Sequence, residues 1–172
     1  MKLLEAITTY FMGEKIEALV FLLPLGLLSL VFGGWLWSES AGGSFARGVA
    51  IPFLAMGLVM GVVGGVVGFR TPAQVTSLTA AVEASPASAL REERARMEKV
   101  NRAWPVYVAV WAVFGVVGLA LRFGTHGDFT QGLGISLVFF GGVGLLGDGF
   151  AERRARPYTA ALEAHASSSN LP

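Results

Sequence analysis

Four long apolar runs, almost free of charge, constrain this chain more than any other feature of its sequence. They cover residues 16–37, 48–69, 105–123 and 132–150. The first, of about 22 residues, would form a helix about 33 Å long, which matches the hydrocarbon core of a bilayer. A charge at mid-bilayer costs about 2.5–3.5 kcal/mol on the insertion scale, and Arg122 and Asp148 stand only at the margins of these runs. The sequence therefore predicts four transmembrane helices.

Composition supports an all-α integral membrane protein. Of the 172 residues, 53% are hydrophobic and only 15% are charged, which lies outside the usual range of soluble domains. Cysteine is absent, which excludes disulfides and thiolate metal sites. The first run is too long for a cleaved signal peptide, and its start has the acidic residues Glu14 and Glu17 in place of a basic cluster.

The distribution of Lys and Arg predicts the direction of the four spans. Basic residues gather before the first span, between the second and third, and after the fourth: Lys2, Lys15, Arg70, Arg91, Arg94, Arg96, Lys99, Arg102, Arg153, Arg154 and Arg156. The other two loops have only Arg47 and Arg122 at their edges. By the positive-inside rule both termini are cytoplasmic. We expect a multi-pass protein of the bacterial cytoplasmic membrane, with Trp35 and Trp37 at the outer interface and Trp104 at the inner one.

Two segments outside the spans are also predicted to be helical. Residues 1–13 carry their apolar side chains on one face, which predicts a short interfacial helix on the inner membrane surface that ends at Gly13. The alternative is a first turn of the first span. Residues 71–103 predict a cytoplasmic helical hairpin that starts with Thr71 as the cap of Pro72 and breaks at Ser85–Pro86. Residues 151–172 form the cytoplasmic tail.

The second helix of this hairpin carries a narrow apolar stripe made of Leu90, Met97, Val100 and Trp104. Such a stripe favours packing on a neighbouring helix, on the membrane surface or on a docked partner. Two ion pairs at i, i+4 spacing are expected beside it, Glu92 with Arg96 and Glu98 with Arg102. Because acids and bases alternate in this charge run, it is more typical of a solvated helix face than of a nucleic-acid site.

The two halves of the chain, about 1–84 and 85–172, resemble each other at an offset of 84 residues. Glu14-Lys15-Ile16 corresponds to Glu98-Lys99-Val100, and Arg70 corresponds to Arg154. Each half has two spans and inserts in the same direction, so a duplication would give a 2+2 pseudo-repeat about an axis along the membrane normal. The alternative is convergence, because apolar helices rich in glycine match one another by chance.

Glycines are predicted to hold the spans together. In lipid the hydrophobic effect does not drive helices to associate, so close packing of their backbones has to stabilise the contact. The candidates are Gly57, Gly61, Gly64, Gly65, Gly68, Gly141, Gly144 and Gly147. Gly57, Gly61 and Gly65, at intervals of four, are expected to make the tightest contact. The alternative is that these glycines line a pore or let a helix bend. Pro24 and Pro52 are expected to kink their spans.

Charged residues at the inner ends of the spans are the other candidate site. They are Glu14, Glu17, Arg70, Asp148, Glu152, Arg153 and Arg154. They predict either a ring of ion pairs that fixes the helix register, or an ion or headgroup site centred on Asp148.

Neither His126 nor His165 lies in a span, so no haem ligand is available there. Nucleotide-binding and hydrolase motifs are absent, and we expect no cofactor, metal or catalytic residue.

Three functional hypotheses follow. The first is a non-enzymatic structural or accessory protein, surrounded by membrane lipids, that docks a membrane or cytoplasmic protein and binds no nucleic acid. The second is a homo-oligomeric channel or carrier for ions or small solutes, against which stands the scarcity of polar residues in the spans, where Ser29 and Ser136 are nearly the only ones. The third, a membrane enzyme acting on lipid, would need clustered His or acidic residues at the interface.

Overall fold

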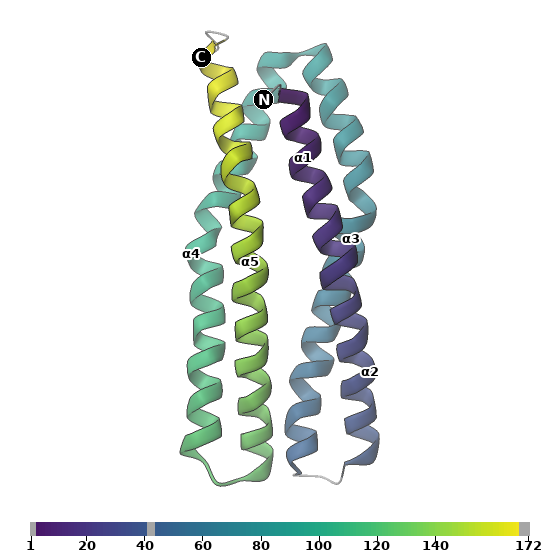
Figure 1. Ribbon diagram of the computed structural model, residues 1–172, viewed down its shortest axis with the longest axis vertical. Coiled ribbons are helices and arrows are strands. Elements are labelled where there is room, and N and C mark those ends of the chain that lie inside the picture. Colours follow the sequence, from purple (N-terminus) through teal and green to yellow (C-terminus); the bar gives the residue numbers. More distant parts are fainter. Residues whose placement is uncertain (1–2, 41–43, 169–172) are drawn as a thin grey trace.

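The computed structural model describes residues 3–40 and 44–168, and these form four helical rods (Figure 1). The first rod joins α1 (Leu3–Ile16), a π-helical turn η1 (Glu17–Leu22) and α2 (Leu23–Glu39). The others are α3 (Phe45–Ala84), α4 (Pro86–Gly124) and α5 (Asp128–Ser168). All four are long and apolar enough to cross a membrane.

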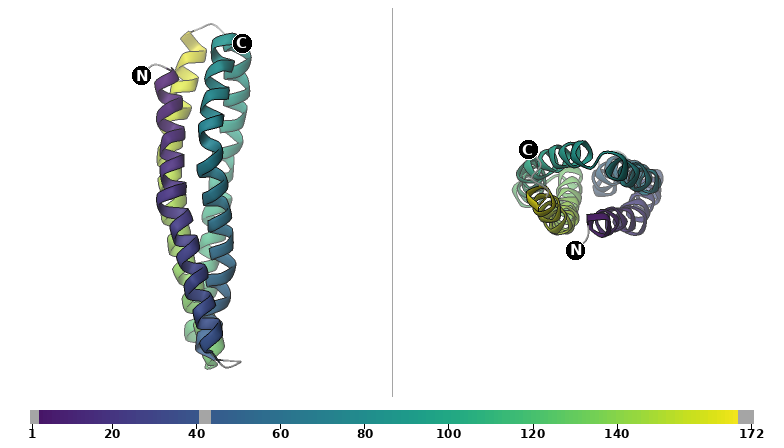
Figure 2. Two further views of the ribbon diagram at one scale, coloured as in Figure 1. Left: turned by 90° about the vertical axis from the view of Figure 1, so that its right-hand side faces the viewer. Right: turned by 90° about the horizontal axis from the view of Figure 1, so that it is seen from above.

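The rods lie alongside one another, with both ends of the chain and the α3–α4 connection at one end of the molecule (Figures 1 and 2). The α2–α3 and α4–α5 connections lie at the opposite end. A helix of about 40 residues is about 60 Å long, twice the thickness of a bilayer core. Each rod therefore has length for a membrane span and for a second segment beyond it.

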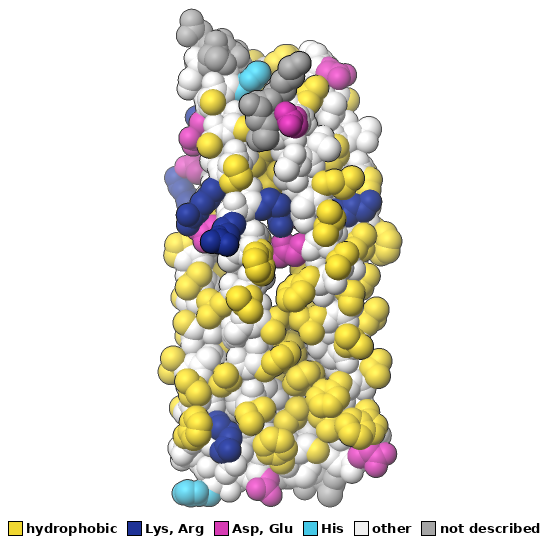
Figure 3. All heavy atoms as spheres, in the orientation of Figure 1, with side chains coloured by type: hydrophobic (Ala, Val, Ile, Leu, Met, Phe, Trp, Pro, Cys, Tyr) yellow, Lys and Arg dark blue, Asp and Glu magenta, His cyan; other side chains and the backbone are white. Residues whose placement is uncertain are grey.

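We call residues 16–37, 48–69, 105–123 and 132–150 the apolar half of the molecule. It lies toward the end that carries the α2–α3 and α4–α5 connections. Apolar side chains cover the face of this half seen in Figure 3, and charged side chains gather beyond it. Large apolar residues more than 60% exposed include Val20, Leu28, Val31, Phe69, Val116, Phe123 and Leu146. This outward apolar surface is the reverse of the pattern in a soluble bundle.

The rest of the helical residues form the polar half, which has an ordinary hydrophobic core. Its buried residues come from α1, α4 and α5, and they are Leu3, Ala6, Ile7, Tyr10, Phe11, Leu90, Met97, Ala155, Tyr158 and Leu162. Val75, Leu78 and Val82 of α3 pack against this cluster. Burial from water can therefore stabilise the polar half.

The predicted break at Gly13 is wrong, because the helix continues through it to Ile16 and beyond. A glycine inside a helix costs about 1 kcal/mol relative to alanine, which packing of the flanking α1 residues into the core outweighs. Gly13 also lies against the Arg154 side chain, where a Cβ would collide with Cδ. Leu3, Ile7 and Phe11 are buried in this chain's own core, so the apolar face of residues 3–13 contacts protein.

The predicted start of a new helix at Thr71 is also wrong. α3 runs through Thr71 and Pro72 to Ala84, and the Thr71 hydroxyl donates to the Val67 carbonyl at 2.6 Å in the manner of a residue inside a helix. The helix does break at Ser85, whose N–H donates to the Ala81 carbonyl, and α4 starts at Pro86. α5 continues through the tail to Ser168, and residues 169–172 lie outside the described residues.

The first rod has the one π-helical turn among the described residues, and it ends just before Pro24. Proline has no N–H, and its ring excludes the carbonyl four residues earlier, here that of Val20. A widened turn before the proline accommodates both effects. Pro52, in contrast, is buried inside an uninterrupted α3.

Candidate functional site

The charged residues at the boundary between the two halves are dispersed over several contacts. Arg154 of α5 donates to Glu17 of η1 at 2.6 Å, with the side chains 20% and 17% exposed. This is the one ion pair between different rods among the described residues, because the other three join neighbours on one helix. Glu17 and Arg154 therefore connect the first rod to the fourth.

The remaining members of the predicted ring do not converge on Asp148. The Asp148 carboxylate accepts a hydrogen bond from Trp111 Nε1 at 2.6 Å, and Glu152 pairs with Arg156 at 2.7 Å. Arg70 and Arg153 are exposed. Oε2 of Glu14 and Nε of Arg154 are buried without a hydrogen-bond partner.

The predicted docking stripe is part of the polar half's own core. Leu90 and Met97 are buried, 3% and 0% exposed, and Val100 and Trp104 pack against the same cluster. The stripe therefore packs on neighbouring helices of this chain, one of the three uses expected for it. A partner would have to contact another surface.

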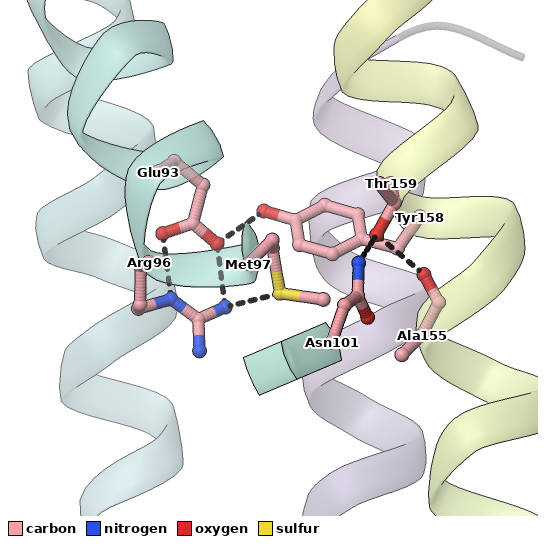
Figure 4. A network of polar contacts seen from close by, with 7 residues as sticks. All are labelled: Glu93, Arg96, Met97, Asn101, Ala155, Tyr158 and Thr159. Carbon is pink, nitrogen blue, oxygen red and sulfur yellow. Dashed lines mark hydrogen bonds and ion pairs between the residues drawn. The ribbon is translucent and has the colours of Figure 1, made fainter. Parts of the chain in front are cut away.

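A buried polar network crosses this core (Figure 4). Glu93 of α4 accepts from Arg96 Nε at 2.8 Å and Nη2 at 2.6 Å, and from the Tyr158 hydroxyl of α5 at 2.7 Å. The sequence pattern paired Arg96 with Glu92; the structure pairs it with Glu93, whereas the expected Glu98–Arg102 pair is present. The sequence position of Glu93 indicates its burial, because Glu93 lies three residues from Leu90 and four from Met97, on the apolar stripe.

Aromatic rings surround this network. Tyr10 stacks on Tyr158 with centroids 4.4 Å apart, and the Arg96 guanidinium lies 5.3 Å from the Phe11 ring centroid and 5.7 Å from that of Tyr10. Burial, and then the Glu93 charge, raise the pKa of Tyr158. Burial would lower the pKa of Arg96, but its hydrogen bonds to Glu93 and the Glu93 charge raise it overall. Burial and the Glu14 charge raise the pKa of Tyr10.

A groove runs between α4 and α5 on the outside of the polar half. Its larger cavity measures about 660 Å³ and is lined by Arg91, Arg94, Glu98 and Arg102 among others, with Met97 and Leu162 at its buried side. A smaller cavity of about 320 Å³ continues it toward Trp104. Both share Asn101, Thr159 and Glu163. We call this feature the α4–α5 groove.

Asn101 and Thr159 hold the two walls of the α4–α5 groove together. Asn101 Nδ2 donates to Thr159 Oγ1 at 3.1 Å (Figure 4). Trp104 Nε1 donates to Asn101 Oδ1 at 3.3 Å. Arg91 and Arg94 are exposed and form no ion pair with any residue that the structure describes. The groove therefore presents two uncompensated cations above a fixed polar floor.

Glycines bring α2 and α3 into backbone contact in the apolar half. A Cβ on Gly57 would lie 2.9 Å from the Gly26 carbonyl oxygen, and one on Gly64 would lie 2.6 Å from the Leu23 nitrogen. Gly68 faces the Leu19 side chain, but a Cβ on Gly61 or Gly65 would meet nothing within 4 Å. The contact with the first rod therefore includes Gly57, Gly64 and Gly68, and also the backbone of Gly61, with which a Cβ on Gly26 would collide. Of the expected Gly57, Gly61 and Gly65 stripe, Gly65 is the position that makes no such contact with a described residue.

The α4–α5 pair is built in the same way. A Cβ on Gly118 would lie 2.6 Å from the Gly134 carbonyl oxygen, and Gly141 lies against Trp111 and Gly115. Gly144 lies against the Trp111 indole, whereas Gly147 has only Phe21, at 3.9 Å, within contact distance. These glycines set how closely α4 and α5 approach.

The α2–α3 pair and the α4–α5 pair are the two hairpins of the apolar half, and they meet through α3 and α5. Gly48 faces Phe129 and Leu133, and Gly132 faces Phe45 and Val49. Nearby, the Ser136 hydroxyl donates to the Gly132 carbonyl at 3.0 Å and also lies 3.4 Å from that of Val49. Phe53 stacks on Phe139 at 5.5 Å. Backbone contacts and aromatic rings therefore fill the space between α3 and α5.

The chain matches no family model, and neither curated proteins nor solved structures show a significant similarity to it. Among the described residues, no three His, Asp or Glu side chains are grouped so that they could hold a metal ion. The features of this chain that bear on its function are the α4–α5 groove, the boundary charges and the packing of the two halves.

Proposed function

We propose that this chain is a non-enzymatic, multi-pass protein of the cytoplasmic membrane whose polar half docks a protein partner in the cytoplasm. The apolar half supports the membrane placement, because its large apolar residues face outward. The surplus of Lys and Arg near the polar half supports a cytoplasmic location for that half. The proposed orientation puts both termini and the α3–α4 connection in the cytoplasm.

The observation that carries the docking proposal is the α4–α5 groove. Arg102 is neutralised by Glu98 and Arg156 by Glu152, which leaves Arg91 and Arg94 as cations for an incoming group. Glu163, on the α5 wall, is the one carboxylate lining the groove that forms no ion pair within the described residues. Two unpaired cations against one unpaired carboxylate favour a partner segment in which acidic residues predominate.

Site-specific photo-crosslinking in intact cells tests this proposal. A photoreactive residue at Ala95, which lines the groove, should give a discrete adduct with one protein, and Arg91→Glu with Arg94→Glu should abolish it. The same probe at Ala80, exposed on α3, is the matched control. No adduct from Ala95, or the same adduct from Ala80, would contradict docking in the groove.

We also propose that the two hairpins arose by duplication, and paired glycine contacts support this. An offset of 84 exchanges the two sides of one contact: Gly48 faces Phe129 and Leu133, and Gly132, 84 residues after Gly48, faces Phe45 and Val49, 84 residues before Phe129 and Leu133. Gly57 meets Gly26, Ser29 and Leu30, while Gly141 meets Trp111, Phe114 and Gly115. The offset is 84 between α3 and α5, and 85 between α2 and α4.

A homo-oligomeric channel or carrier is the second candidate. Gly61 and Gly65 support it, because they have GxxxG spacing with open space over each, and only 6% of the apolar window of α4 is buried within the chain. A pathway between copies would be needed, since Phe53, Phe139 and Phe140 fill the contact between α3 and α5. A defined oligomer in detergent that also conducts ions in liposomes would favour this candidate, and a non-conducting monomer would favour the first.

A further inference from the structure

A separate cavity of about 240 Å³ lies between α1 and α3, away from the α4–α5 groove. Thr8, Met12 and Lys15 line it from α1, and Thr71, Pro72 and Val75 line it from α3. Lys15 directly precedes the first apolar run, and Thr71 closely follows the second. The cavity therefore lies at the boundary between the apolar and polar halves, which the membrane placement proposed above makes the inner surface of the bilayer.

The walls of this cavity are apolar except at Lys15. Both threonine hydroxyls donate within their own helices, Thr8 to Leu4 at 2.9 Å and Thr71 to Val67 at 2.6 Å. Lys15 forms no ion pair with any described residue, and the positions three and four residues away on its rod are Phe11, Met12, Ala18 and Leu19. One uncompensated cation thus stands beside an apolar pocket.

The size of the cavity limits what can occupy it. Sites that enclose a whole small molecule usually measure about 300–1,000 Å³, so this one holds only part of its ligand. A membrane lipid meets that condition, because the rest of its chains stay in the bilayer. Anionic headgroups also predominate at the cytoplasmic surface, where basic residues attract them.

We propose that this cavity binds an anionic phospholipid of the inner leaflet, with its phosphate at Lys15 and the first part of an acyl chain between Met12 and Val75. The proposal depends on the membrane placement above, but not on the docking partner. A soluble phosphate ester has the same charged group without the apolar part, and it would leave most of the cavity wall unused.

Binding of phosphatidylglycerol and phosphatidylcholine to the detergent-solubilised full chain tests the proposal, with native mass spectrometry counting bound lipids. We expect the chain to prefer phosphatidylglycerol and Lys15→Gln to weaken that lipid about fivefold, the scale of one basic residue near an anionic surface. Lys99→Gln is the matched control, because Lys99 is exposed 84 residues later and lines none of the cavities described above. Val75→Phe, which fills the cavity, should weaken binding while Lys15 is intact.

Three results would overturn the proposal. Equal losses in Lys15→Gln and Lys99→Gln would indicate diffuse surface charge, and undiminished binding by Val75→Phe would show that the cavity is not used. Competition by glycerol 3-phosphate as strong as that by phosphatidylglycerol would assign the site to a soluble phosphate ester. Recovery of the chain in the soluble fraction without detergent would instead contradict the membrane placement, which separates that failure from a failure of lipid binding.

Discussion

Glu93 is only 7% exposed, yet it lies in a helix segment rich in charged residues. Moving a charge out of water costs several kcal/mol unless hydrogen bonds and an opposite charge offset the loss. Arg96 supplies two hydrogen bonds and the charge, and the Tyr158 hydroxyl supplies a third bond from another helix. Tyr158 thus joins α5 to a charge pair on α4, and its hydroxyl can be removed without disturbing the ring.

We expect Tyr158→Phe to destabilise the chain by about 1.5–3 kcal/mol, the usual contribution of a hydrogen bond to a charged group. The effect should grow smaller above about pH 10. Burial raises the pKa of Tyr158 in the folded chain, so above the ordinary tyrosine pKa of about 10 the unfolded chain ionises and the folded chain does not. Stability from this tyrosine is therefore complete below pH 10 and is lost as the pH rises.

Thermal unfolding in detergent at a series of pH values measures both effects, and Tyr107→Phe is the control because Tyr107 is 45% exposed. Equal melting of Tyr158→Phe and the wild type at neutral pH would show that the buried hydrogen bond contributes nothing. A wild-type chain that became more stable above pH 10 would contradict the direction of the pKa shift.

At the scale of elements, the two halves of each rod are held by different forces. Side chains fill the core of the polar half, whereas the α2–α3 and α4–α5 pairs of the apolar half touch through glycine backbone. Small residues are needed where lipid surrounds the helices, because close packing replaces the hydrophobic effect there. Adjacent glycines on one helix can therefore differ in whether the packing leaves room for a side chain in their place.

Gly64 and Gly65 provide that comparison. A Cβ on Gly64 would lie 2.6 Å from the Leu23 nitrogen and 2.9 Å from the Ala18 carbonyl oxygen, whereas one on Gly65 meets open space. Both Gly→Ala changes gain about 1 kcal/mol of helix propensity. We expect Gly64→Ala to lower the melting temperature in detergent and Gly65→Ala to keep or raise it. If both changes raised it alike, backbone contact at Gly64 would not stabilise the α2–α3 pair.

Sequence reasoning predicted the four long apolar helical segments and the Ser85–Pro86 break. It failed where tertiary packing outweighs local signals. Thr71-Pro72 has the residues of a helix start, and Gly13 those of a helix end, yet α3 and the first rod continue through both. Spacing alone also could not decide which glycines have no room for a side chain, because a Cβ on Gly64 would collide with Leu23 whereas one on Gly61 would meet open space. Glu93 has two opposing signals, because its charge is typical of a solvated helix face whereas its place on the apolar stripe indicates burial.

At the scale of the whole molecule, one end carries both chain ends and the α3–α4 connection, and the other carries two short connections (Figure 1). The proposed orientation assigns these ends to opposite sides of a membrane. Ser88 lies near the first end and His126 lies between α4 and α5 at the second, and both are exposed. Because the chain has no cysteine, a single cysteine at either position reports on one end alone.

We expect a membrane-impermeant maleimide to label His126→Cys in intact cells and Ser88→Cys only after the membrane is opened. The physical reason is the excess of Lys and Arg between the second and third spans and in the tail, which holds these segments in the cytoplasm during insertion. The reverse labelling pattern would invert the orientation and place the α4–α5 groove outside the cell, where no cytoplasmic partner could reach it. Protection of both cysteines until lysis would mean that the rods do not cross the membrane, and the outward apolar surface would then have to be covered by other protein.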